Sequence, residues 1–363
     1  MTNRSIPSLA ATPWPRSGGD RRNSGYFPCE GPDCCDVIWD VSLPDPPADR
    51  GYLASGAIVA ADGCLRVVHQ AILRSVSLNG RVLWRYSLRR RGSRGTGYSL
   101  PLALDDGSVW LTANGRLLSE RDGNVVVVAR GELGDDSTVS LNVGYDGSIY
   151  FGGSTTASRW RQGEIRHLDT AGYDLLSPAV YPDGSVGLAS YYGTGLCRRD
   201  SAGRLIFQAK TKSREQDGLV TVNDRDEAAC HALNDWNTVV VDSQGNVLWI
   251  FDRPATFSCI PGPDGGWLAL SSRDLTSLSP SGEVLWTREV QAGLGKRPRQ
   301  ALIDSRGFIY APSDRGLEVF DRQGSAVDHT DWPSGETSAL CPVAPGQMAL
   351  IHENRLCLVG KAR

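Results

Sequence analysis

Short runs of small and apolar residues alternate with polar turns along the whole chain, and the pattern repeats about every 40 residues. Each copy holds one apolar run, a turn that usually contains Asp-Gly, and a second apolar run. The eight copies begin at Gly56, Pro101, Leu141, Pro178, Leu219, Ser258, Ala301 and Leu340. Short strands joined by tight turns at this period are typical of a β-propeller.

The turn in each copy needs one residue with a positive φ, a conformation that glycine adopts without steric cost. Glycine fills this position in seven copies, and either Arg225 or Asp226 fills it in the fifth copy. The seven glycines are Gly63, Gly107, Gly147, Gly184, Gly265, Gly307 and Gly346. The regular spacing of these turns predicts that the first two strands of every repeat form a hairpin.

A second pattern, Gly-x-φ-φ-Trp or a degenerate form of it, lies between the copies of the first. Its seven copies begin at Asn79, Asp122, Gln162, Ala202, Gln244, Ser281 and Gln323. An eighth strand of this kind, CDVIWDVSL, occupies residues 35–43 and lacks the three strands that should precede it. Pairing of this strand with the last repeat would close the ring and complete the last sheet.

The sequence therefore predicts an all-β fold, a single eight-bladed β-propeller with four antiparallel strands in each blade. In this interpretation residues 1–34 are an N-terminal leader or strap, residues 35–363 are the propeller, and residues 35–43 complete the last blade. One closed propeller accommodates 363 residues, and 41 glycines and 20 prolines suit a fold with many tight turns.

Hydropathy and cysteine content bear on the cellular location. No apolar run approaches the roughly 18 residues of a membrane-spanning helix, so no membrane partner is expected. The N-terminal segment lacks the continuous apolar stretch of a secretory signal, and the number of cysteines, nine, is odd. These features favour a cytoplasmic location, where thiols stay reduced.

The cysteines fall into two groups. Six lie in or beside predicted strands and are expected to be buried thiols: Cys64, Cys197, Cys230, Cys259, Cys341 and Cys357. Cys29, Cys34 and Cys35 lie outside the blades, and a thiolate metal site or a vicinal disulfide stays open as an interpretation of this group. The Cys-x-x-Cys spacing of zinc sites is missing and no histidine is nearby in sequence, so no metal is predicted.

The repeats resemble the quinoprotein-like propeller repeat, also called the PQQ-type repeat, in which each repeat ends in a Gly-x-φ-φ-Trp strand. The residues that carry the resemblance are Trp84, Trp249 and Trp286, together with Trp14-Pro15, Gly19-Asp20 and Asn23-Ser24-Gly25 in the leader. The resemblance implies the fold and leaves the activity open. Quinoprotein alcohol dehydrogenases bind pyrroloquinoline quinone and calcium on the propeller axis, whereas relatives of the outer-membrane assembly lipoprotein class bind no cofactor and are protein-docking scaffolds.

A quinone-dependent dehydrogenase is disfavoured because the chain is much shorter than those enzymes. It also shows no recognisable set of Glu, Asn and Asp residues for calcium. No cofactor is therefore expected.

The propeller topology separates the loops onto two faces. The turns between strands one and two share a face with those between strands three and four, and they are rich in aspartate: Asp62, Asp106, Asp146, Asp183 and Asp264. The opposite face carries the blade-to-blade links, three of which are basic: Arg89, Arg90, Arg91 and Arg94; Lys210, Lys212 and Arg214; Lys296, Arg297 and Arg299. These links predict a positive face that attracts anions, although they are also compatible with ordinary solvated loops. Nucleic acid is not expected as a partner, because the net charge is −3 and aromatic residues do not interleave with the basic ones.

Three of the five histidines, His69, His231 and His352, lie seven residues after the first residue of the turn in their copies. This register places them at the end of a second strand, at the rim of the link face. Converging imidazoles would suit general acid–base chemistry or metal binding. The alternative is that each histidine only donates a hydrogen bond to a neighbouring backbone carbonyl.

Two functions follow from these features. The first is a propeller-fold binding protein whose positive face binds an anionic small molecule or a partner protein. The second is a cofactor-independent lyase, cyclase or hydrolase for a small polar metabolite, with His231 or His69 as base and His352 and Asp235 as further catalytic candidates. Under either hypothesis, the ligand-binding candidates are Arg89, Arg91, Arg94, Lys212, Arg214, Lys296, Arg297, Trp236, Tyr191 and Tyr192.

Overall fold

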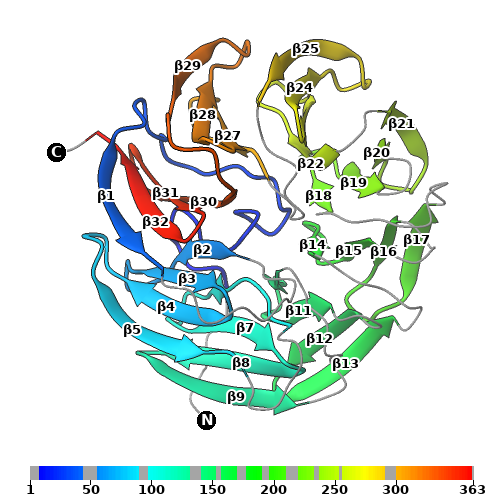
Figure 1. The fold of residues 1–363 in the computed structure, drawn as a ribbon. Coiled ribbons are helices and arrows are strands. Elements are labelled where there is room, and N and C mark those ends of the chain that lie inside the picture. Colours follow the sequence, from blue (N-terminus) through cyan, green and yellow to red (C-terminus); the bar gives the residue numbers. More distant parts are fainter. Residues whose placement is uncertain are drawn as a thin grey trace.

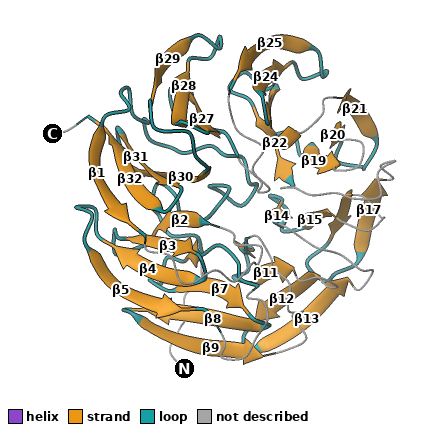
Figure 2. Cartoon of the chain, viewed as in Figure 1, coloured by secondary structure: helices purple, strands orange, loops and turns teal. Residues whose placement is uncertain are grey.

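The computed structural model is a ring of four-stranded antiparallel sheets, each of which radiates from a common axis (Figure 1). It describes residues 8–43, 55–89, 97–130, 140–152, 157–169, 177–189, 196–209, 220–232, 237–252, 256–290 and 300–361. Within these ranges the secondary structure consists of strands, turns and loops (Figure 2). No helix in these ranges has the length and hydropathy needed to cross a membrane. The eight sheets confirm the predicted eight-bladed β-propeller.

The first four blades contain consecutive strands, ordered from the axis outward. Blade one consists of β2 (Gly56–Val59), β3 (Leu65–His69), β4 (Ile72–Val76) and β5 (Val82–Ser87). Blade two consists of β6 (Leu102–Ala103), β7 (Val109–Ala113), β8 (Arg116–Arg121) and β9 (Asn124–Arg130). Blade three consists of β10 (Asn142–Val143), β11 (Ile149–Gly152), β12 (Ala157–Arg161) and β13 (Glu164–Asp169). Blade four consists of β14 (Ala179–Val180), β15 (Val186–Ala189), β16 (Leu196–Arg199) and β17 (Leu205–Ala209).

The second half of the ring repeats this arrangement. Blade five consists of β18 (Thr221–Val222), β19 (Ala228–Ala232), β20 (Asn237–Val241) and β21 (Val247–Asp252). Blade six consists of β22 (Thr256–Pro261), β23 (Trp267–Ser271), β24 (Asp274–Leu278) and β25 (Val284–Glu289). Blade seven consists of β26 (Leu302–Ile303), β27 (Ile309–Ser313), β28 (Gly316–Phe320) and β29 (Ala326–His329). Blade eight consists of β30 (Thr337–Ala344), β31 (Gln347–His352), β32 (Arg355–Gly360) and the N-terminal strand β1 (Val37–Ser42).

Strand β1 closes the ring, as the incomplete repeat at the start of the sequence predicted. It pairs antiparallel with β32, with Trp39 opposite Leu358 and Val41 opposite Leu356. In Figure 1 the blue β1 accordingly lies on the outer edge of the red blade. The closure removes the free sheet edge that an open array of repeats would present.

Burial follows the order of the strands within a blade. The second strand β3 is buried at every position, whereas the fourth strand β5 alternates between exposed and half-buried residues. Inner strands are covered on both faces by neighbouring blades, which explains why their sequences are mostly apolar. The two polar residues of β3, Arg66 and His69, are buried and hydrogen-bonded to Glu120 and Ser55. In the fifth turn, Asp226 has the positive φ (59°) that glycine supplies in the other copies.

Aromatic residues of the fourth strands pack against the glycine turn of the next blade. A methyl group added at Gly282 would lie 2.7 Å from the Trp249 ring, and the Trp249 Nε1 donates a hydrogen bond to the Pro280 carbonyl (3.0 Å). The same contact joins Trp39 to Gly80, and the Trp39 Nε1 donates to the Leu78 carbonyl (2.8 Å). The tryptophans of the second sequence pattern therefore join neighbouring blades around the circumference.

Candidate functional site

The leader crosses the middle of the ring and contacts the innermost strands of several blades. Its backbone is hydrogen-bonded to the innermost strands of blades one, two, four, five and seven: Val59 to Trp14, Ala103 to Ala10 and Pro15, Val180 to Arg21, Val222 to Arg22, and Ile303 to Gly25 and Phe27. Figure 1 shows this blue segment in the middle of the ring. Side chains complete the contact, since Trp14 and Phe27 are buried and their rings meet edge to face. The predicted strap is therefore an axial plug.

Arg16 fixes the plug to the middle of the ring. Its side chain is completely buried, and its Nε donates to the Leu141 carbonyl (3.0 Å) while its Nη2 donates to Ser140 Oγ (3.2 Å). Its Nη1 donates to the Asp20 carbonyl and to Asn23 Oδ1. Burial lowers the pKa of Arg16 to about 9. These hydrogen bonds form only when the leader lies in one position. Removing the charged guanidinium from water costs free energy, so the net stabilisation is smaller than the number of hydrogen bonds suggests.

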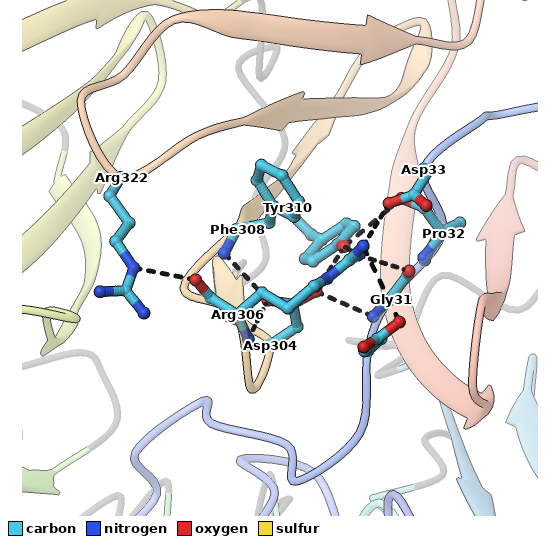
Figure 3. Close-up of polar contacts among 9 residues, drawn as sticks. Gly31, Pro32, Asp33, Asp304, Arg306, Phe308, Tyr310 and Arg322 are labelled. Atoms are coloured by element: carbon cyan, nitrogen blue, oxygen red, sulfur yellow. Dashed lines mark hydrogen bonds and ion pairs between the residues drawn. The ribbon is translucent and has the colours of Figure 1, made fainter.

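A second anchor joins the end of the leader to blade seven (Figure 3). The buried carboxylate of Asp304 accepts hydrogen bonds from the Gly31 backbone N–H (2.9 Å), Tyr310 Oη (3.0 Å) and Arg306 Nη2 (2.9 Å). Arg306 also forms an ion pair with Asp33 and donates to the Gly31 carbonyl (2.8 Å). This cluster holds the leader where it leaves the axis toward β1.

A small cavity remains at one end of the channel, with a volume of about 60 Å³. Its lining includes Trp14 and Ser17 from the leader, residues 55–58 at the start of β2, and residues 338–340 at the start of β30. Leu100, Gln300, Leu302 and Pro312 complete the wall. These positions precede or begin first strands, or end a second strand, so the cavity lies on the face of the blade-to-blade links. One water needs about 10–15 Å³ by this measure, so the cavity has room for a few waters or a very small chemical group.

The axial site does not fit pyrroloquinoline quinone. The leader occupies the axis where the family resemblance would place that cofactor, and a cavity of about 60 Å³ is far smaller than a tricyclic quinone requires. Among the described residues, no group of three or more His, Cys, Asp or Glu residues is arranged to hold a metal ion. Cys29, Cys34 and Cys35, the weak metal candidates, are included in that search.

His69 lies beside the cavity and connects blade one to blade eight. Its Nδ1 is 2.9 Å from the Oγ of Ser55, and its Nε2 is 3.0 Å from Oδ1 of Asn354. Both Ser55 and His69 are buried, and Ser55 lines the cavity. From their neighbouring blades, His69 and His352 were expected to face each other across this interface, but the partner of His69 from blade eight is Asn354.

His352 has the same position in blade eight. Its Nδ1 is 3.0 Å from Thr337 Oγ1, and its Nε2 is 3.2 Å from the Pro333 carbonyl oxygen. The Trp332 ring packs edge to face against the imidazole. The contact with Pro333 corresponds to the alternative in which a histidine at the strand end bonds a backbone carbonyl.

The shared register predicted for three histidines holds for two of them and is wrong for His231. His69 and His352 are the last residues of β3 and β31, opposite Ile72 and Arg355 respectively. In blade five the corresponding last residue is Ala232, opposite Asn237, and His231 lies one residue earlier. The prediction failed because the fifth turn lacks the glycine that anchors the alignment, and Asp226 has the positive φ that marks the equivalent position. His231 therefore does not have the strand position that His69 and His352 share.

Most of the predicted rim lies outside the described residues. This holds for Asp235, Trp236, Tyr191, Tyr192, Arg91, Arg94, Lys212, Arg214, Lys296 and Arg297. Arg89 is described, lies two residues after the end of β5 and is half-buried. These residues stay predictions of the sequence.

The acidic face is less negative than the sequence pattern implied. Four of its five turn aspartates form ion pairs with arginines: Asp62 with Arg66 (2.8 Å), Asp106 with Arg121 (2.7 Å), Asp146 with Arg161 (3.1 Å) and Asp183 with Arg198 (2.9 Å). Burial raises the pKa of Asp183, but hydrogen bonds from Ser185 and Arg198 outweigh burial and hold the pKa below its usual value. The predicted polarity therefore rests mainly on the basic links of the other face.

All nine cysteines are described and are in the thiol form. Five of the six cysteines predicted to be buried are buried, and Cys64 is the exception because it lies half-buried in the turn before β3. Burial raises the pKa of Cys230 to about 12. Burial also raises the pKa of Cys357 to about 11, because it outweighs the lowering effect of Arg355. Cys34 and Cys35 do not form the vicinal disulfide that the sequence left open.

Sequence reasoning missed Ser55 and Asn354 as members of the histidine site. A signal was available in the sequence. In the two blades whose second strand ends in histidine, a small hydroxyl residue lies just before or at the start of the first strand: Ser55 in blade one and Thr337 in blade eight. Antiparallel pairing places that residue opposite the histidine. The role of the leader as an axial plug was also missed, because its contacts reach blades far away in sequence.

No protein-family model and no curated protein matches the sequence. Among solved structures, the chain is similar to virginiamycin B lyase from Staphylococcus aureus, with 13% sequence identity and a TM-score of 0.55 over 89% of this chain and 99% of that chain. It is also similar to BamB from Moraxella catarrhalis, with 14% identity and a TM-score of 0.59 over 90% of this chain and 98% of that chain. A third similar structure is the WD40 β-propeller domain of Doa1, with 17% identity and a TM-score of 0.50 over 70% of this chain and 90% of that chain.

At these identities the similarity shows the β-propeller fold alone. The three proteins include an enzyme, and a shared fold hosts unrelated functions. The function of this chain must therefore be argued from its own residues.

Proposed function

We propose that this propeller is a binding protein that presents its link face to an anionic small molecule or an anionic partner protein. The observation that carries the proposal is that the cavity is lined where first strands begin, and three of the links that lead to first strands are basic in the sequence. The cavity is lined by the starts of β2, β26 and β30, where links enter the blades. The basic residues lie in the sequence between β5 and β6, between β17 and β18, and between β25 and β26.

The axial plug supports binding at this face. Because Trp14 and Ser17 of the leader form part of the cavity wall and most other lining residues lie where first strands begin, we expect a ligand to enter from the link side. Leu100, Leu302 and Ile58 give the cavity apolar walls, and Ser338 and Gln300 add polar groups. An apolar recess with a few polar groups, together with the basic rim that the sequence predicts, would suit recognition of an anionic group in a specific orientation.

The cellular location is proposed with the function. Nine cysteines in the thiol form support a role in the reducing cytoplasm. The resemblance of the repeats to the quinoprotein-like family, in which some members are docking scaffolds, supports a binding role without a cofactor.

The proposal is tested by reversing charge on one face at a time. The link-face variant is Arg90→Glu/Arg91→Glu, and the matched control is Arg81→Glu/Arg204→Glu, two exposed arginines in turns between third and fourth strands. A fluorescent decaglutamate peptide serves as the acidic partner, and inorganic phosphate serves as the small anion.

At low salt, the link-face variant should bind the peptide about tenfold more weakly than the wild type, and the control should bind it like the wild type. Phosphate should raise the melting temperature of the wild type and of the control, but not that of the link-face variant. Equal binding by all three proteins, or no binding of either probe at low salt, would overturn the proposal.

A further inference from the structure

Ser55, His69 and Asn354 form a hydrogen-bonded chain that ends at the wall of the cavity. The Ser55 Oγ lies 2.9 Å from His69 Nδ1, and His69 Nε2 lies 3.0 Å from Asn354 Oδ1. The three residues lie directly before β2, at the end of β3 and in the turn between β31 and β32. A hydroxyl, a base and an orienting group in this order are the parts of an activated nucleophile.

The contacts of Asn354 define the tautomer of His69. Asn354 Oδ1 accepts a hydrogen bond from Gln70 Nε2 (2.8 Å) as well as facing His69 Nε2. A carbonyl oxygen only accepts hydrogen bonds, so the proton of a neutral His69 lies on Nε2. Nδ1 is then the unprotonated nitrogen, and Ser55 donates its hydroxyl proton toward it.

We infer that Ser55 is a nucleophile activated by His69, and that the protein hydrolyses esters of short acyl groups at this cavity. Ser55 Oγ would attack the ester carbonyl carbon while its proton moves to His69 Nδ1. His69 then returns this proton to the departing alkoxide as the ester C–O bond breaks. A water molecule attacks the acyl-serine by the same route, so that one ester and one water give one carboxylic acid and one alcohol.

The size and location of the cavity define the substrate class. A volume of about 60 Å³ accommodates a group of acetyl size beside Ser55, and Ile58 and Leu100 supply apolar contacts to such a group. Asn354 is a positioning residue, because it acts on the reacting atoms only through the orientation of His69. This activity goes beyond binding at the link face, and its failure would leave the binding proposal untouched.

Two other hydroxyl–histidine pairs show what is specific to blade one. Ser158 Oγ lies 3.0 Å from His167 Nδ1, but this pair joins β12 to β13, and His167 is exposed. Thr337 lies 3.0 Å from His352 Nδ1, and the other nitrogen of that ring faces a backbone carbonyl. Of the three hydroxyl residues, Ser55 alone is among the residues that line the cavity.

The test is covalent labelling of the full chain with methanesulfonyl fluoride, a small reagent that sulfonylates activated serines. Intact-mass spectrometry follows the rate of labelling, and peptide mapping locates the label. We expect one adduct per chain, on Ser55, and none in Ser55→Ala. His69→Gln should slow labelling about a hundredfold, the contribution typical of a general base, and Asn354→Ala should slow it by a smaller factor.

Ser158→Ala is the matched control, because it removes the hydroxyl of a serine–histidine pair away from the cavity. It should be labelled at Ser55 at the wild-type rate, and thermal melts should show that all four variants are folded. The same order of rates is expected for the turnover of p-nitrophenyl acetate. Absence of label on Ser55 in the wild type, or equal labelling rates in wild type and a folded His69→Gln, would overturn the inference.

Discussion

The Asp304→Ala variant tests how much the Asp304 cluster stabilises the leader, beyond the stability that an aspartate gives to its own turn. Asp304 accepts from the N–H groups of Arg306 and Phe308 in its own turn, both at 2.9 Å. Asp321, in the turn between β28 and β29 of the same blade, accepts from the N–H groups of Gln323 (2.9 Å) and Ser325 (2.7 Å) in the same way. Asp321→Ala is therefore the matched control for the turn contacts of Asp304.

The additional partners of Asp304 give the expected difference between the two variants. Asp304→Ala also removes the acceptor of the Gly31 N–H, of Tyr310 Oη and of the Arg306 guanidinium. A buried donor left without its acceptor costs about 1–3 kcal/mol, and breaking a buried ion pair costs about 3–5 kcal/mol in total. Asp304→Ala should thus lower the free energy of unfolding by about 3 kcal/mol more than Asp321→Ala.

Urea unfolding followed by tryptophan fluorescence measures both free energies, and limited proteolysis of the folded protein reports release of the leader. We expect cleavage between residues 8 and 36 to accelerate in Asp304→Ala and to stay at the wild-type rate in Asp321→Ala. If the two variants lose the same free energy within about 0.5 kcal/mol, the Asp304 cluster does not anchor the leader and the reasoning fails.

Three further predictions concern a contact between blades, the cysteines and two turn aspartates. In urea unfolding, Gly282→Ala should destabilise the protein by about 1–3 kcal/mol more than Gly265→Ala. Both glycines have a positive φ, but only at Gly282 would the added methyl group meet Trp249. Equal losses of unfolding free energy in the two variants would contradict the tryptophan contact. In the folded protein, a thiol reagent at pH 8 should modify at most the three half-buried cysteines, Cys29, Cys34 and Cys64. In denaturant it should modify all nine. A fourth rapidly reacting thiol in the folded protein would be inconsistent with the packing. The pKa values of Asp62 and Asp183 are held low by their arginine partners and by hydrogen bonds within their turns, against the effect of burial. The stability that these groups contribute should therefore be present above about pH 4 and be lost as the pH falls through their folded pKa values. The difference between the unfolding free energies at pH 6 and pH 3 should be smaller in Asp62→Asn/Asp183→Asn than in the wild type. An unchanged difference would refute this.

The blades were predictable because their signals are local. Each turn needs a particular backbone conformation within five residues, and each strand shows its burial in its own apolar run. Even ring closure was visible, since 35–43 carried the pattern of a fourth strand without a blade of its own. The turn at Asp226 shows the limit of this reasoning, because a missing glycine shifted the alignment of His231 by one residue.

The sequence by itself determined the number of blades, the strand order and the strand that closes the ring, because these features depend on a periodic pattern that recurs in every repeat. Only the tertiary structure decided what occupies the axis and which groups meet there. Asn354 lies 285 residues from His69, and Arg16 reaches Leu141 across 125 residues, and neither separation leaves a trace in a local pattern. Such contacts arise only when the closed ring brings the first and last repeats together around the leader.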